Sequence, residues 1–89
     1  MKLQGKVAIV TGGARDLGRA ISIKFAQEGA KVAVNYFDNP EDAAETLKLI
    51  QAAGSEGIIV QGDMTKATDV KNLFDKAIEA FGNHIDALV

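Results

Sequence analysis

The chain has 89 residues, of which 47% are hydrophobic and 25% are charged, a composition typical of one ordinary globular domain. Its formal net charge is −2 and its basic residues are scattered, so neither nucleic acid nor a membrane surface is an expected partner. There is no cysteine, no signal-peptide core and no apolar run of about 18 residues, and we therefore expect a cytoplasmic protein without disulfides or thiolate metal sites.

The first predicted element is a short buried strand, Val7–Val10, which ends at a Thr-Gly-Gly turn. A helix is predicted next, because apolar side chains recur at helical spacing at Leu17, Ala20, Ile21 and Phe25. Gly29 suits the position that follows the last helical residues.

A second strand and helix follow in the same order. Residues 32–34 repeat the pattern of a buried strand, and the segment DNPEDAAETLKLIQAAG has the signals of a helix. Asn39 is predicted to cap this helix and Pro40 to be its first residue, while two acidic residues favour the positive end of the helix dipole. Gly54 is predicted to end it.

The third unit begins with a strand at residues 58–60, and Thr65 is predicted to cap the helix that follows. That helix carries one apolar stripe from Val70 to Phe81 and ends at Gly82. A fourth strand is expected over residues 85–89. Strands and helices that alternate in this way indicate a parallel sheet with right-handed crossovers. The following residues on the predicted helices are assigned to the core: Ala43, Ala44, Leu47, Ile50, Leu73 and Phe74.

The segment T-G-G-A-R-D-L-G, residues 11–18, connects the first strand to the first helix. Glycine lets the backbone approach a phosphate closely, and the free N–H groups at a helix start point toward it. The spacing of Gly12, Gly13 and Gly18 does not fit the common G-x-G-x-x-G pattern, so a tight turn in a protein that binds no nucleotide stays an alternative.

The chain resembles the short-chain dehydrogenase/reductase family over its whole length, in particular 3-oxoacyl-carrier-protein reductases and glucose dehydrogenases. Family members carry T-G-x-x-x-G-x-G where this chain has residues 11–18, with Asp16 in place of the middle glycine. They also carry an acidic residue after the third strand, often in a D-V-T context, which contacts adenine. Here GDMT offers Asp63 and Met64, although Asp63 could instead help to start the next helix. The segment HIDALV looks like the strand that precedes the family's N-N-A-G motif.

The resemblance implies an α/β fold of Rossmann type with three layers, in which a parallel four-stranded sheet of order 3-2-1-4 is flanked by three helices. It also implies a nicotinamide dinucleotide as cofactor. The residues implied to bind it are Thr11, Gly12, Gly13, Ala14, Arg15, Asp16, Leu17, Gly18, Asn35, Tyr36, Asp63 and Met64. In this assignment the diphosphate faces Asp16 and its neighbouring amides.

The resemblance favours NADP over NAD. In relatives specific for NAD, an acidic residue at the end of the second strand binds the adenosine ribose, and the matching position here is Tyr36, next to Asn35. Arg15 is implied to face the 2′-phosphate of NADP, although it could equally be a solvated loop cation. Asp38 lies two residues after Tyr36 and keeps NAD open, and Phe37 stands where many NADP-binding relatives carry arginine.

The residues that the family uses for catalysis are missing from this chain. The resemblance implies a serine and a Tyr-x-x-x-Lys pair, but the single tyrosine, Tyr36, is followed four residues later by Pro40. Ser22 and Ser55 lie far from any such pair, and His84 is expected in a solvated turn. We interpret residues 1–89 as the N-terminal, cofactor-binding part of a Rossmann domain, without turnover of its own.

A second interpretation is a free-standing module that associates with itself. With strand order 3-2-1-4, two helices cover one face of the sheet and one helix the other, so apolar strand residues are expected to be exposed. A homodimer or larger assembly is the predicted result. A strand order closer to that of flavodoxin is an alternative within this interpretation.

Asp16 is predicted to compete with the cofactor. An aspartate at or just before the first residue of a helix is a favoured N-cap, and its carboxylate would accept the N–H bonds that a phosphate takes. The alternative is that the carboxylate turns outward to Arg15 or Arg19 and leaves the amides free.

Overall fold

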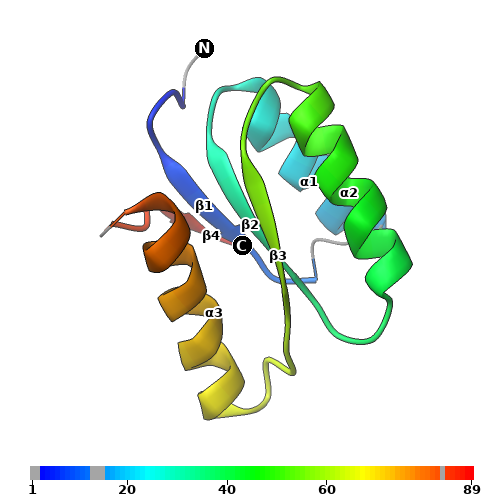
Figure 1. The fold of residues 1–89 in the computed structure, drawn as a ribbon, viewed down its shortest axis with the longest axis vertical. Coiled ribbons are helices and arrows are strands. Elements are labelled where there is room, and N and C mark those ends of the chain that lie inside the picture. The colour runs from blue at the N-terminus through cyan, green and yellow to red at the C-terminus, as the bar shows by residue number, and fades with distance from the viewer. Residues whose placement is uncertain (1–2, 13–15, 83) are drawn as a thin grey trace.

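The computed structural model describes residues 3–12, 16–82 and 84–89. Within these ranges strands and helices alternate, and no helix is both long and apolar enough to cross a membrane. Figure 1 shows the elements in chain order: β1 (Val7–Val10), α1 (Asp16–Gln27), β2 (Lys31–Tyr36), α2 (Pro40–Ala52), β3 (Gly57–Gln61), α3 (Ala67–Phe81) and β4 (Ala87–Leu88).

The four strands form one parallel sheet in the order β3-β2-β1-β4, which confirms the predicted topology over the flavodoxin-like alternative. β4 is shorter than predicted. Its flanking residues still pair with β1, because the amide of Asp86 donates to the carbonyl of Val7 at 2.8 Å and that of Val89 to Ile9 at 2.9 Å. His84, expected in a solvated turn, is half exposed, and its Nε2 lies 3.2 Å from Oδ2 of Asp86.

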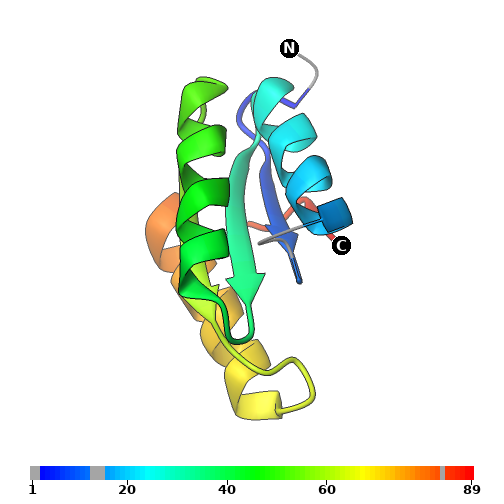
Figure 2. The ribbon, with the colours of Figure 1, turned by 90° about the vertical axis from the view of Figure 1, so that its right-hand side faces the viewer.

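The sheet is the middle of three layers, with α1 and α2 on one face and α3 on the other (Figures 1 and 2). Successive strand residues point to opposite faces, so the sheet feeds two cores. The core beneath α1 and α2 contains Val10, Ala26, Val32, Val34, Ala43 and Ile50. The core beneath α3 contains Ile9, Ala33, Val60, Leu73 and Ala77.

The expectation of exposed apolar strand residues is wrong for most of the sheet. Val7, Ile9 and Ala33 belong to the face that only one helix covers, yet each is at most 1% exposed. α3 packs against β1, β2 and β3 at once, which explains their burial. The exposed apolar residues of the sheet are Leu88 and Val89, at and beside its β4 edge.

Two predicted helix stripes also differ from the structure in detail. In α1 the buried residues are Ser22 and Ala26, whereas Leu17 and Ala20 are exposed. Ser22 can take a core position because its hydroxyl donates to the carbonyl of Gly18 at 2.8 Å. In α2, Ala44 is exposed, although it was assigned to the core.

The predicted ends of α2 and the predicted end of α1 are correct, whereas the predicted cap of α3 is not. Asn39 caps α2, because its side chain accepts a hydrogen bond from the amide of Asp42 at 3.2 Å. Gly29 and Gly54 follow α1 and α2 with φ of 97° and 92°, as left-handed C-terminal residues. Thr65 does not cap α3: the residue at that position is Lys66, and no side chain caps the helix.

Candidate cofactor site

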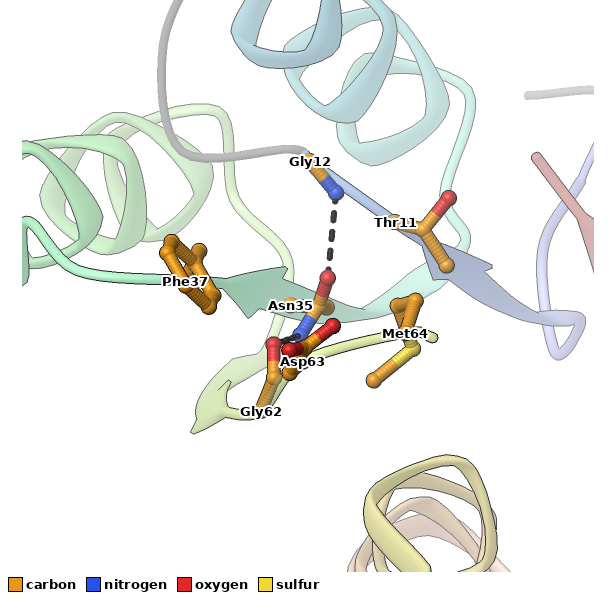
Figure 3. Close-up of a pocket in the computed structure, with 7 residues that line it drawn as sticks. All are labelled: Thr11, Gly12, Asn35, Phe37, Gly62, Asp63 and Met64. Atoms are coloured by element: carbon orange, nitrogen blue, oxygen red, sulfur yellow. Dashed lines mark hydrogen bonds between the residues drawn. The ribbon is translucent and has the colours of Figure 1, made fainter. Parts of the chain in front are cut away.

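A cleft of about 450 Å³ opens where β1, β2 and β3 end, at the carboxyl edge of the sheet (Figure 3). Ligands of open α/β sheets bind at this edge, and the volume falls in the range of about 300–1,000 Å³ that small-molecule sites occupy. The residues that line it come from the ends of three strands or directly follow them: Thr11, Gly12, Asn35, Phe37, Gly62, Asp63 and Met64.

Asn35 holds the three strand ends together. Its side chain is almost fully buried, and its Oδ1 accepts a hydrogen bond from the amide of Gly12 at 3.2 Å. Its Nδ2 donates to the carbonyls of Gly62, at 3.1 Å, and Val60, at 3.3 Å. One carboxamide therefore fixes the segment after β1 relative to the segment after β3, and the expected contact of Asn35 with a ribose stays a prediction.

The backbone at Gly12, shortly after β1, has a conformation that glycine adopts most easily. Gly12 has φ of 63°, and a Cβ placed on it would meet no atom within 4 Å, so the backbone angle rather than space selects glycine. Thr11, one residue earlier, is tied to the end of β4: its amide and its hydroxyl both donate to the carbonyl of Val89, at 2.8 and 2.7 Å. The entry to the glycine loop is thus held on two sides.

Asp63 forms a small turn at the far side of the cleft. Its Oδ1 accepts hydrogen bonds from the amide of Thr65, at 2.9 Å, and from the hydroxyl, at 2.6 Å. These bonds, together with the nearby Lys66, lower the pKa of the Asp63 carboxyl below its usual value. The Asp63 amide donates to Oδ2 of Asp69 at 2.8 Å, which anchors the turn to α3. The cleft thus has a fixed carboxylate at one edge.

Asp16 is the first residue of α1 and has φ of 55°, a left-handed conformation that aspartate tolerates better than most residues. Its side chain is exposed, and among the described residues its carboxylate makes no hydrogen bond or ion pair. The predicted N-cap bond to the amides that follow is therefore not formed. The family pattern has glycine at this position, and glycine adopts the same left-handed backbone angle without strain.

Arg19 does not bind the Asp16 carboxylate, so this form of the outward-turned alternative is not observed. Its Nε donates to the hydroxyl of Thr46 at 2.8 Å, and its terminal nitrogen donates to the carbonyl of Asp42 at 3.0 Å. Arg19 therefore connects α1 to α2. The other alternative partner, Arg15, lies outside the described residues.

Five of the predicted cofactor residues meet in the cleft: Thr11, Gly12, Asn35, Asp63 and Met64. Gly13, Ala14 and Arg15 lie outside the described residues, while Asp16, Leu17 and Gly18 begin α1, where Leu17 is 74% exposed. Tyr36 packs against the core beneath α1 and α2 instead of lining the cleft.

The cleft has two lining residues that the sequence analysis did not assign to the site, Phe37 and Gly62. Phe37 could have been found from strand alternation. Asn35 and Tyr36 point to opposite faces of β2, so the first residue beyond the strand is the next one free to turn toward the strand ends. Gly62 directly follows β3, where a side chain would crowd Met64 and Asp69 at 3.2–3.3 Å.

The chain matches the family pattern described as short chain dehydrogenase over residues 6–89. Among curated relatives, short chain dehydrogenase/reductase nsrJ of Aspergillus novofumigatus is 42% identical over 88 residues, which are 99% of this chain and 33% of the relative. The hydroxynaphthalene reductase-like protein Arp2 of Metarhizium acridum is 41% identical over 87 residues, 98% of this chain and 32% of the relative.

Solved structures agree with the sequence matches. A short chain dehydrogenase from Burkholderia cenocepacia in complex with NADP superposes with a TM-score of 0.93 at 41% identity, over 99% of this chain and 36% of that one. A short-chain dehydrogenase/reductase mutant from Serratia marcescens gives a TM-score of 0.94 at 35% identity, with coverage of 99% and 36%. The chain spans about a third of the length of these relatives. By fold, sequence pattern and relatives, this chain belongs to the short-chain dehydrogenase family.

Proposed function

We propose that this chain is the cofactor-binding, N-terminal part of a Rossmann domain from an NADP-dependent oxidoreductase that acts on a carbonyl or alcohol. The observation that carries the proposal is the cleft at the strand ends, where Gly12 after β1 faces Asp63 after β3 across the carboxamide of Asn35. The NADP complex of the relative from Burkholderia cenocepacia supports the choice of cofactor class. When bound, the cofactor supplies or accepts the hydride.

The residues of the site suit a dinucleotide. The diphosphate would lie along residues 11–18, where the left-handed Gly12 keeps the backbone open toward the cleft. Asp63 and Met64 would contact the adenine, and Asn35 and Tyr36 mark the ribose end of the site. Arg15 would face the 2′-phosphate. We favour NADP because neither Asn35 nor Tyr36 is acidic; NAD is the alternative, with Asp38 as the residue that would favour it.

We further propose that the 89 residues alone do not turn over substrate. Neither serine is available as a proton donor, because the hydroxyl of Ser22 donates to the carbonyl of Gly18 and that of Ser55 to the carbonyl of Ala30. The only tyrosine, Tyr36, has no lysine four residues later. A cysteine-free chain suits a cytoplasmic setting, which we include in the proposal.

Titration calorimetry of the chain with NADP and NAD tests the binding part of this proposal. We expect saturable binding that is tighter for NADP. A variant of the glycine loop, Gly12→Val, should bind far more weakly, because a β-branched residue disfavours φ of 63°. NADPH oxidation with a panel of carbonyl substrates tests the inactivity. Absence of binding at millimolar cofactor would refute the first part, and turnover would refute the second.

A second candidate function, self-association, rests on the edge of the sheet at β4. That edge has no neighbouring strand among the described residues, and Leu88 and Val89 are 58% and 47% exposed beside it. Unpaired strand edges with apolar side chains favour pairing with another chain. Light scattering should then give a dimer or larger assembly, and Leu88→Lys should shift it toward the monomer. A monomeric wild-type chain that melts cooperatively would exclude this function.

A further inference from the structure

Two apolar side chains stand on opposite sides of the cleft, Phe37 and Met64 (Figure 3). Met64 is partly buried and packs against the core beneath α3, which holds its side chain in place at this side of the cleft. Phe37 is 64% exposed, which is unusual for a large aromatic side chain that lies beside a cleft. Packing in the protein core therefore does not account for a large aromatic residue at position 37.

The backbone places Phe37 firmly although its ring is exposed. The residue directly follows β2, and its carbonyl accepts a hydrogen bond from Nε2 of Gln61 at 3.2 Å. The carbonyl of the preceding residue, Tyr36, accepts the amide of Gly62 at 2.9 Å. The two donors are Gln61, the last residue of β3, and Gly62, which follows it. The pairing of β2 with β3 thus holds the Phe37 backbone at the rim of the cleft.

The polar groups between these two side chains are mostly occupied by protein partners. The Asn35 carboxamide bonds with Gly12 and Gly62, and Oδ1 of Asp63 accepts two bonds from Thr65. Among the described residues that line the cleft, none is cationic. A ligand group that fits these surroundings is flat, uncharged and aromatic, with a hydrogen-bond donor at its edge for the remaining oxygen of Asp63.

We propose that Phe37 is a cofactor-binding residue whose ring stacks on the adenine base of the bound dinucleotide. This inference rests on the proposed function, which places adenine beside Asp63 and Met64. Every nucleobase offers a flat π-face, and removal of an aromatic partner weakens binding by about 5- to 150-fold. Stacking by Phe37 thus gives the site affinity for the adenosine end of the cofactor from a side chain without charge.

The test measures binding of NADP, ADP and nicotinamide mononucleotide by calorimetry. Phe37→Ala should weaken NADP and ADP by a similar factor within the range above, and Phe37→Tyr should restore both, because tyrosine keeps the ring. Nicotinamide mononucleotide has no adenine, so its affinity should not change. Ile78→Ala is the control, since it truncates a partly exposed apolar residue of α3 outside the cleft.

The outcomes separate this inference from the proposed function. If the wild-type chain binds neither NADP nor ADP, the proposed function itself fails. If it binds both and Phe37→Ala stays within about twofold of the wild type, Phe37 does not stack and only the inference fails. An equal loss for nicotinamide mononucleotide would also overturn it, because the substitution would then have distorted the whole site. Melting curves of each variant show whether it is folded.

Discussion

Asn35→Asp is the most informative substitution at the cleft, because it changes one group and leaves the shape of the side chain unchanged. A carboxylate can still accept the hydrogen bond from the amide of Gly12. It cannot donate, so an oxygen would face the carbonyls of Gly62 and Val60 where Nδ2 now lies 3.1 and 3.3 Å from them. At 3% exposure, water cannot relieve this contact.

The expected loss of stability follows from these contacts. Two lost hydrogen bonds contribute about 0.5–1.5 kcal/mol each, and an unpaired buried charge adds more, so we expect a loss of about 3–5 kcal/mol at pH 7. A chain of 89 residues has a total stability of about 5–13 kcal/mol, so the variant should still fold over all but the lowest part of this range.

The loss should depend on pH with a definite sign. Burial beside two carbonyls raises the pKa of the introduced carboxyl in the folded state, so the folded state binds more protons than the unfolded state at mildly acidic pH. The stability of the variant relative to wild type should therefore increase as pH falls from 7 toward 5, because the protonated carboxyl can donate one hydrogen bond.

Urea unfolding followed by circular dichroism at several pH values measures both effects. Asn39→Asp is the matched control: Asn39 caps α2 as an acceptor only, and aspartate is an equally good N-cap, so its stability should change by less than about 0.5 kcal/mol. If Asn35→Asp were as stable as this control at pH 7, or showed no gain at lower pH, Asn35 would not be the donor that joins the strand ends.

Three further predictions concern other contacts of the chain. Asp16→Gly should tighten NADP binding about tenfold, because it removes a negative charge next to the proposed diphosphate position. It should not cause the loss of about 1 kcal/mol that follows removal of an N-cap, because Asp16 forms no cap bond with the described residues and glycine adopts φ of 55° freely. Calorimetry and melting curves measure both effects, and weaker binding would contradict the prediction. Thr65→Val should raise the pKa of Asp63 toward its usual value in an NMR titration; in the wild type the lowered pKa contributes stability that is lost as pH falls below about 4, and an unchanged pKa would contradict the role of the Thr65 hydroxyl. Gly29→Ala should destabilise the chain more than Gly54→Ala, because both have left-handed φ but only at Gly29 would a Cβ meet backbone, Gln4 Cα at 3.0 Å; equal losses would show that the backbone angle alone matters.

The fold could be predicted from the sequence because its signals are local. Asn39 and Gly54 delimit α2 as expected, since capping and left-handed termini depend on a few neighbouring residues. The start of α3 was predicted wrongly for a physical reason. The hydroxyl of Thr65 donates back to Asp63, so it is engaged in the turn before the helix and not in its cap.

The position of the cleft follows from the sequence, whereas the contacts that its residues make do not all follow from it. The strand ends that bring Gly12 and Asp63 together follow from parallel pairing, which the alternating pattern indicates. The carboxamide of Asn35 bonds to Val60 and Gly62, which lie 25 and 27 residues away in the sequence, and the contact of Asn35 with the cofactor stays a prediction. Such long-range contacts leave no local signal.

The double hydrogen bond between Thr11 and Val89 has a consequence for synthesis of the chain. These residues are 78 positions apart, so the contact closes a loop that includes β2, β3 and β4. A contact of such high sequence separation carries a large entropy cost of loop closure, which slows folding. On the ribosome, the first residue of the glycine loop cannot be anchored until residue 89 has left the exit tunnel. The nascent chain therefore cannot form this contact beside the cleft before residue 89 is available.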